Sequence, residues 1–304
     1  MARSVDPSVV AEEVRGKIRA DLKTLPMPLR LVGLLAVDHG PSATYAEYTR
    51  KACADVGVEY QLRQTTRLEL EHAILEANVA PDVHGIMVYY PVFGNEQDAY
   101  LRDVVSPHKD MEGLHRFWAK CLYENRRFLD AERRQKAILP CTPLAILKLV
   151  EASGIFGQAP RPLAGKKVCI FNRSEIVGRP LAAMMANDGA EVVSFDVDSA
   201  LLFAPDPQSD GHVVRETPLD RQHALQQADI VITGIPSRDF VPIAAAEIQA
   251  GTLCINFSTL RNFAEDIEDK AGIFVPRVGP MTVTMALRNT LQLFRNQQLE
   301  AARS

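Results

Sequence analysis

The 304-residue sequence lacks features that would place it in several classes of protein. No apolar run approaches the ~18–20 residues that a transmembrane helix needs, and the first residues contain no apolar signal-peptide core. Lys and Arg number 34 against 38 Asp and Glu, so the formal net charge of −4 provides no basic excess for nucleic acid. We therefore expect neither a membrane nor a nucleic acid as partner.

Paired cysteines are also missing. The sequence contains no Cys-x-x-Cys motif, and its cysteines stand far apart, at Cys53, Cys121, Cys141, Cys169 and Cys254. This pattern argues against a disulfide framework and against a zinc site. We expect no metal site, and a reducing compartment, the cytoplasm, fits the cysteine usage best.

What is present is the composition of a globular protein, with 47% hydrophobic and 24% charged residues and a length typical of two domains. In the first half, apolar runs typical of buried strands predict strands at 29–37 and 84–90, and residues 58–63 alternate like a strand. Helical spacing and caps predict helices at 7–22, 42–56 and 68–78, the second beginning at Ser42 and ending at Gly57. Alternating strands and helices predict a parallel sheet covered by helices.

The second half repeats this plan. Strands are predicted at 167–171, 191–196, 229–233 and 252–256, and helices at 142–154, 177–187 and 282–299. Thr142 is the expected N-cap of the first of these helices. Segment 203–219 contains three prolines and a glycine, and we expect a long surface loop there. The last helix is strongly amphipathic, which suits packing back on the first half.

A tight turn between a buried strand and a helix, residues 172–180, is the most informative segment. Such a turn offers the free N–H groups of the helix to a pyrophosphate, and Asp196, eighteen residues beyond Gly178, stands where an acid binds the adenosine ribose. Gly178 alone survives of the usual Gly-x-Gly-x-x-Gly pattern. Asn172 replaces the first glycine, since Asn tolerates a left-handed backbone. The alternative is an ordinary strand–helix–strand unit without a nucleotide.

Asp196 also bears on the choice of cofactor. A carboxylate there favours a free ribose 2′-hydroxyl and repels a 2′-phosphate, so NAD is expected rather than NADP. Arg173 points the other way, because an arginine in this turn can contact a 2′-phosphate; otherwise it contacts the pyrophosphate or a neighbouring acid. Asp198 is a second acid, for which a solvated charge at the strand end is the simpler interpretation.

An aromatic cluster occurs in the first half. Tyr45, Tyr48 and Thr49 are spaced by three or four residues and are expected on one face of a helix. Tyr89 and Tyr90 end a predicted strand. Together they suit the stacking of a flat heterocycle, and the alternative is that they fill a core.

Ordered segments along nearly the whole chain resemble the methylenetetrahydrofolate dehydrogenase/cyclohydrolase family. The matching segments are 45–57, 82–91, 106–113, 140–143, 173–180 and 278–282. The resemblance implies an α/β fold of two three-layer domains with a cleft between them. Residues 1–148 with 280–304 would form a folate-binding catalytic domain, and residues 149–279 a Rossmann-type NAD-binding domain. It also implies a homodimer.

Departures from the family pattern point to one branch. The lysine of the Tyr-x-x-x-Lys motif is Thr49, the glutamine of Val-Gln-Leu-Pro is Tyr89, and the aspartate of Asp-Gly is Glu112. The glycine of Gly-Arg-Ser is Asn172. These changes resemble the monofunctional NAD-dependent enzymes known from fungi, which oxidise 5,10-methylenetetrahydrofolate in one-carbon metabolism and purine biosynthesis.

The resemblance implies roles for individual residues. Around the substrate it places Tyr45, Thr49, Tyr89, Glu112, Cys141, Val278, Gly279 and Pro280, of which Tyr45, Thr49 and Cys141 stand at the catalytic positions. Around NAD it places Asn172, Arg173, Ser174, Ile176, Val177, Gly178, Asp196, Val197, Thr233, Gly234 and Ile235. Hydride transfer needs no nucleophile, so Cys141 is equally a small buried apolar residue.

Three other functions remain open at this stage. One is the bifunctional NADP-dependent enzyme of the same family, against which Thr49 and Asp196 argue. Another is a Rossmann-like binding protein without catalysis. The third is an amino-acid or shikimate-type dehydrogenase, whose Lys–Asp pair has no evident place in this sequence.

Overall fold

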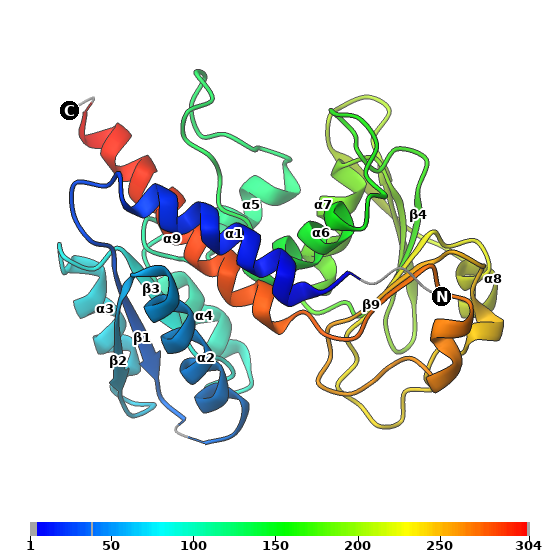
Figure 1. The fold of residues 1–304 in the computed structure, drawn as a ribbon, viewed down its shortest axis with the longest axis horizontal. Coiled ribbons are helices and arrows are strands. Elements are labelled where there is room, and N and C mark those ends of the chain that lie inside the picture. The colour runs from blue at the N-terminus through cyan, green and yellow to red at the C-terminus, as the bar shows by residue number, and fades with distance from the viewer. Residues whose placement is uncertain (1–4, 38, 303–304) are drawn as a thin grey trace. The chain divides into compact units, whose positions relative to one another are not determined.

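The protein, described here from a computed structural model covering residues 5–37 and 39–302, divides into two compact units. The ends of the predicted domain ranges, 1–4 and 303–304, lie outside these described residues. Unit 1 comprises Met1–Val10, Leu122–Asn125 and Thr142–Thr282, and unit 2 comprises Ala11–Cys121, Arg126–Cys141 and Val283–Ser304. No helix in the described ranges is long and apolar enough to cross a membrane. Figure 1 shows the elements of both units.

Unit 2 contains a three-stranded parallel sheet in the order β2-β1-β3. Its strands are β1 (Arg30–Leu35), β2 (Glu59–Gln64) and β3 (Gly85–Val88). β1, the inner strand, and β3 at one edge are both buried along nearly their whole length, as expected for a parallel sheet covered on both faces. The strands predicted from the sequence are therefore all present; β1 and β3 are each three residues shorter than predicted, and β2 is shifted by one residue.

Helices cover both faces of this sheet. On one face α3 (Leu70–Val79) and α4 (Glu96–Val104) pack on β1 and β3 through a cluster that includes Val32, Ile74 and Leu101. On the other face α2 (Gly40–Val56) contacts Met87 through Thr49. The other helices with residues in this unit are α1 (Pro7–Leu22), α5 (Arg116–Tyr123) and α9 (Gly279–Ala301).

The final helix, α9, completes unit 2, as its amphipathic pattern predicted. Figure 1 shows it running beside α1, and an ion pair of 3.1 Å joins Arg295 to Asp21 there. The buried side chain of Asn289 donates from its amide nitrogen to the carbonyls of Met111 (3.0 Å) and Leu139 (2.8 Å). α9 thereby ties together two loops that precede Glu112 and Cys141.

Unit 1 contains a seven-stranded sheet in the order β10-β9-β8-β4-β5-β6-β7. Five strands are parallel, and β6 and β7 add an antiparallel hairpin at one edge. The strands are β4 (Lys167–Phe171), β5 (Glu191–Phe195), β6 (Ala200–Pro205), β7 (His212–Glu216), β8 (Ile230–Thr233), β9 (Leu253–Asn256) and β10 (Ile273–Val275). Its helices are α6 (Cys141–Ala152), α7 (Gly178–Asn187), α8 (Arg221–Leu225) and the short η1 (Ala245–Glu247) and η2 (Glu265–Asp269).

Three expectations about local structure are wrong. Segment 203–219 is no long surface loop, because the end of β6 and the whole of β7 lie in it and Phe203 is buried. Ser42 does not begin α2, which starts at Gly40 after His39 in the N-cap position. Thr142 likewise lies inside α6, which starts at Cys141.

Candidate functional site

The carboxyl ends of β4 and β8 form the predicted dinucleotide site of unit 1. β5, the next strand in the chain, lies on one side of β4, and β8 lies on its other side. The direction in which strands are added to the sheet therefore reverses at β4. Such a switch point leaves a crevice outside the carboxyl ends of the strands, where ligands of open α/β sheets bind. Phe171 pairs with Phe195 of β5 and with Thr233 of β8, so all three strands end at one level.

Asn172 holds this crevice in shape through its side chain. Its amide nitrogen donates to the carbonyl of Gly234 (2.8 Å), and its Oδ1 accepts from the Ser174 backbone N–H (3.0 Å) and from the Ser174 hydroxyl (2.7 Å). The expected left-handed backbone is wrong, because Asn172 is not among the described residues with positive φ. Where the family pattern has a glycine, the asparagine therefore links the end of β4 to the end of β8 through its side chain.

Two glycines allow close approach of the backbone in the same crevice. A Cβ on Gly178 would lie 2.0 Å from the carbonyl oxygen of Asn172, and a Cβ on Gly234 would lie 1.9 Å from the ring of Phe257. Gly178 begins α7 with Val177 at its N-cap. The first N–H groups of this helix are bonded within the turn, because Gly178 donates to the Ser174 hydroxyl (3.4 Å), Arg179 donates to the Ser174 carbonyl (3.0 Å), and Pro180 has no N–H. This cradle of strand ends, glycines and a helix N-terminus fits the pyrophosphate of a dinucleotide.

At the turn after β5, the Asp196 carboxylate faces solvent and the Arg173 guanidinium is largely buried. The Asp196 side chain is 51% exposed, whereas that of Arg173 is only 12% exposed. Arg173 donates from Nη2 to the carbonyls of Ser194 and Ser199, each at 2.7 Å, and from Nη1 to the Ser199 hydroxyl at 2.8 Å. Ile176 and Val197 are exposed aliphatic side chains in the same region of the chain.

Thr233 and Ile235 support the site through buried polar contacts. The Thr233 hydroxyl donates to Asn256 Oδ1 (3.1 Å), and the backbone N–H of Ile235 donates to Asn262 Oδ1 (2.9 Å). Thr233 is fully buried, so its hydroxyl is committed to the protein.

In unit 2, α2 presents only part of the predicted aromatic face. Tyr45 is half-buried and Thr49 is fully buried, with its hydroxyl donating to the Tyr45 carbonyl (2.9 Å) and 3.6 Å from the Met87 sulfur. The expectation that Tyr48 shares this face is wrong, because its side chain is 60% exposed. Burial raises the pKa of Tyr45 well above its usual value, and the neighbouring Cys141, Glu112 and Tyr89 raise it further.

A further tyrosine, Tyr60 of β2, contacts this cluster, and the sequence did not predict it. Its ring lies over β1 at Gly33, where a Cβ would come within 2.2 Å of the Tyr60 hydroxyl. The hydroxyls of Tyr60 and Tyr89 lie 2.6 Å apart. Tyr89 in turn meets Tyr45 edge to face, with ring centroids 5.9 Å apart at 81°. The alternation of buried and exposed residues along 58–63 was the only available signal.

Glu112 is the acid of this site. Burial raises the pKa of its half-buried carboxyl to about 8, with a further contribution from Asp110. The buried Asp110 carboxylate accepts backbone N–H groups from Glu112 (3.1 Å), Gly113 (3.0 Å) and His115 (2.7 Å) and so fixes the turn that carries Glu112. Burial also raises the pKa of Asp110, to about 6.

Cys141 adjoins this turn, because its backbone N–H donates to the Glu112 carbonyl (3.0 Å). Its side chain is buried, as the apolar interpretation expects. The predicted folate residues Tyr45, Tyr89, Glu112 and Cys141 thus come together in unit 2. Val278, Gly279 and Pro280 belong to unit 1, where the last two begin α9.

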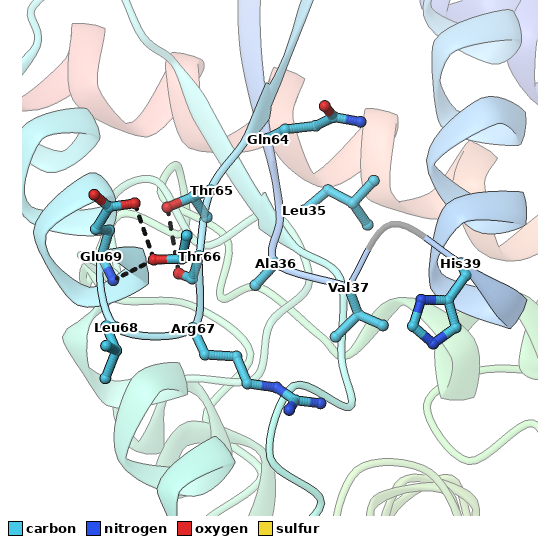
Figure 2. Close-up of a pocket in the computed structure, with 10 residues that line it drawn as sticks. All are labelled: Leu35, Ala36, Val37, His39, Gln64, Thr65, Thr66, Arg67, Leu68 and Glu69. Atoms are coloured by element: carbon cyan, nitrogen blue, oxygen red, sulfur yellow. Dashed lines mark hydrogen bonds between the residues drawn. The ribbon is translucent and has the colours of Figure 1, made fainter.

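An open pocket of about 730 Å³ lies at the carboxyl ends of β1 and β2. Figure 2 shows its lining, in which Arg67 and His39 flank Val37. None of the predicted site residues lines this pocket. Among the residues placed by the structure, no cluster of three His, Cys, Asp or Glu side chains could hold a metal ion, and no disulfide joins the five buried cysteines.

Family models and relatives agree with this geometry. The catalytic domain of tetrahydrofolate dehydrogenase/cyclohydrolase matches residues 5–112, and the NAD(P)-binding domain of the same enzymes matches residues 140–298. A methylenetetrahydrofolate dehydrogenase [NAD(+)] of Dictyostelium discoideum is 42% identical over 297 residues, covering 96% of this chain and 94% of the relative. The Saccharomyces cerevisiae protein of the same name is 44% identical over 279 residues, covering 88% and 87%.

Solved structures agree as well. The NAD-dependent 5,10-methylenetetrahydrofolate dehydrogenase of Saccharomyces cerevisiae superposes with a TM-score of 0.92 at 40% identity, covering 99% of each chain. By contrast, the bifunctional protein FolD of Azoarcus is 29% identical, covering 95% of each chain. Two domain models that together span most of the sequence, and relatives above 40% identity, show that the chain belongs to the tetrahydrofolate dehydrogenase/cyclohydrolase family.

Proposed function

We propose that this chain is a methylenetetrahydrofolate dehydrogenase that uses NAD⁺. The observation that carries the proposal is the identity of 42% and 44% to two enzymes of that name over nearly the whole chain. Asp196 at the end of β5 supports NAD over NADP, because an exposed carboxylate there accepts ribose hydroxyls and repels a 2′-phosphate.

The reaction oxidises the one-carbon bridge of 5,10-methylenetetrahydrofolate to the methenyl cation. Bound NAD⁺ supplies the hydride acceptor. The folate nitrogens stabilise the cation, so the protein needs to supply orientation, a contribution that reaches ~7–11 kcal/mol in ideal cases. We infer that the Tyr45 ring stacks on the pterin, that Glu112 accepts hydrogen bonds from its N–H groups, and that Tyr89 lines the pocket.

Roles in cofactor binding follow from the cradle in unit 1. Ser174 and the positive end of the α7 dipole would bind the pyrophosphate next to Gly178, and Asp196 would bind the adenosine ribose. Ile176 and Val197 offer apolar surface for the adenine. Asn172, Thr233, Gly234 and Ile235 would fix the strand ends that border the cofactor, through the hydrogen bonds that join these ends to one another and to the loops beyond them.

We further propose that the enzyme lacks cyclohydrolase activity. Adding water to the methenyl carbon calls for a general acid or base, typically worth 10²–10⁴-fold. Thr49 and Tyr89 replace the lysine and glutamine of the bifunctional relatives, and both hydroxyls are buried and engaged within the protein. Burial also raises the pKa of Tyr89, so it stays protonated. Lys51 is no substitute, because its exposed side chain pairs with Glu47 (3.5 Å).

One coupled experiment tests both proposals. Purified protein is given methylenetetrahydrofolate with NAD⁺ or NADP⁺, and then methenyltetrahydrofolate alone, with spontaneous hydrolysis subtracted. We expect reduction of NAD⁺ with a clear preference over NADP⁺, and no protein-dependent hydrolysis comparable with that turnover. Equal use of the two cofactors would contradict the role of Asp196. A fast hydrolysis would show a bifunctional enzyme.

The setting of the enzyme is also a proposal. We infer a homodimer in the cytoplasm, where its product serves purine biosynthesis. The family resemblance supports the dimer and the pathway, and five buried cysteines without a disulfide support a reducing compartment. Light scattering during size-exclusion chromatography tests the first, and fractionation of cells tests the compartment.

A further inference from the structure

We propose that Arg173 is a positioning residue that holds Asp196 in the geometry for an unphosphorylated ribose, and that Ser199 is its anchor. The inference rests on the proposed use of NAD⁺ and concerns how this chain chooses between the two cofactors. In it, the arginine does not bind the cofactor of the wild-type enzyme.

The contacts of Arg173 all lie on the β5 turn. Its two terminal nitrogens make three hydrogen bonds of 2.7–2.8 Å, to the carbonyls of Ser194 and Ser199 and to the Ser199 hydroxyl. Hydrogen bonds with one charged partner are roughly twice as strong as neutral ones. The guanidinium therefore joins the segment that follows β4 to the end of β5 and to the turn 196–199 after it.

The same contacts place the acid. The backbone N–H of Asp196 donates to the Ser199 carbonyl at 2.9 Å, so that carbonyl joins Arg173 to Asp196. Asp196 Oδ2 lies 4.0 Å from Arg173 Nη1. The arginine thus closes the turn 196–199 from inside while the carboxylate stays half-exposed on the outside.

This arrangement withdraws the positive charge from a 2′-phosphate. Arg173 Nε is buried without a hydrogen-bond partner, and the whole side chain is only 12% exposed. A phosphate would meet the Asp196 carboxylate first. If Asp196 were replaced by serine, the carboxylate that repels a 2′-phosphate would be lost, and the positive charge of Arg173, 4.0 Å from the position of that carboxylate, would attract the phosphate. Any NADP use gained by that change should then require Arg173.

Binding of ADP-ribose and of 2′-phospho-ADP-ribose, measured by calorimetry, tests the proposal without folate or turnover. In Arg173→Met we expect affinity for ADP-ribose to fall about tenfold, as for the loss of hydrogen bonds to a charged group. In Asp196→Ser we expect measurable binding of 2′-phospho-ADP-ribose, and in the double variant its loss. Arg215→Met, which removes an exposed positive charge from β7 in the same unit, is the matched control.

Two milder variants keep the test informative if Arg173→Met does not fold. Ser199→Ala removes one acceptor and should weaken ADP-ribose by two- to fivefold, roughly the value of one net hydrogen bond. Arg173→Lys keeps the charge but cannot reach the three acceptors together, and should resemble Arg173→Met. Unchanged ADP-ribose affinity in all three variants would overturn the proposal. Full ADP-ribose affinity in Arg173→Lys together with its loss in Arg173→Met would instead show that the positive charge contacts the pyrophosphate directly, and would also overturn the proposal. Wild-type reduction of NAD⁺ is measured separately, so failure of the proposed function remains distinguishable.

Discussion

Replacing Glu112 by glutamine should remove a pH dependence of folate binding between pH 7 and 9. Burial, and then the neighbouring Asp110, raise the pKa of Glu112 from 4.5 to about 8. A carboxyl with this pKa is ionised in roughly one molecule in ten at pH 7 and in nearly all at pH 9. If the ionised form accepts hydrogen bonds from the pterin, as proposed above, KM for methylenetetrahydrofolate should fall about tenfold over that range in the wild type.

The assay is the initial rate of NADH formation at saturating NAD⁺ from pH 6.5 to 9. Glu112→Gln should show a nearly flat KM for folate, with a value at pH 9 well above that of the wild type. KM for NAD⁺ serves as the internal control, since the cofactor residues lie in unit 1. The reasoning fails if wild-type KM for folate is flat with pH, or if Glu112→Gln retains the full slope.

The same pKa predicts a change in stability. A carboxyl whose pKa is higher in the folded protein binds its proton more tightly there, so its contribution to stability is fully present below pH 4.5 and is lost as pH rises through about 8. The shift corresponds to a ceiling of about 5 kcal/mol, and partial exposure reduces this to about 1–3 kcal/mol. Urea unfolding should therefore show Glu112→Gln gaining stability relative to the wild type between pH 5 and 9. A constant difference would contradict the raised pKa.

Three further substitutions test the site. Tyr45→Ala should raise KM for folate by the value of one stacked ring, about 1–3 kcal/mol, with KM for NAD⁺ unchanged, whereas Tyr45→Phe should stay close to the wild type. If alanine and phenylalanine behave alike in steady-state kinetics, the ring is not a platform. Gly178→Ala should cost about 1–3 kcal/mol in urea unfolding and weaken NAD⁺ in calorimetry, because its Cβ would meet the Asn172 carbonyl at 2.0 Å; Gly16→Ala, in open space on α1, is the control and should be neutral or stabilising. Thr49→Lys should restore little hydrolysis of methenyltetrahydrofolate, and a rate near the dehydrogenase turnover would show that lysine alone suffices.

The sequence predicted the parts of the fold that depend on local pattern. Most of the parallel strands follow from apolar runs, because buried parallel strands need apolar residues on both faces. The mostly exposed β2 follows from alternation instead, and the short β10 was not predicted. The hairpin β6–β7 was missed for a physical reason. Pro205 lies beyond the last residue of β6 that pairs with β5, and β7 is an edge strand with exposed valines, so neither shows the pattern of an inner strand.

Most residues of the candidate site come from motifs in the sequence. Contacts that cross between strands were not predicted. Tyr60 reaches Tyr89 only because Gly33, on the strand between them, has no side chain. Which residues of β2 and β3 lie on either side of Gly33 depends on how the strands pair, and the sequence alone does not give that pairing. The partner of Arg173 was left open for the same reason, since several acceptors were available and only the folded turn chooses Ser194 and Ser199.

The contacts of Asn289 determine when the fold of unit 2 can be completed during translation. The loops that carry Glu112 and Cys141 are translated early, but the helix that ties them together follows the whole of segment 142–282. At a synthesis rate of 5–20 residues per second, the roughly 140 intervening residues take about 7–28 s to appear. During that interval the nascent folate-binding half is an unfinished fold with the face that receives α9 uncovered. Its fold is complete only after the whole of segment 142–282 has been made.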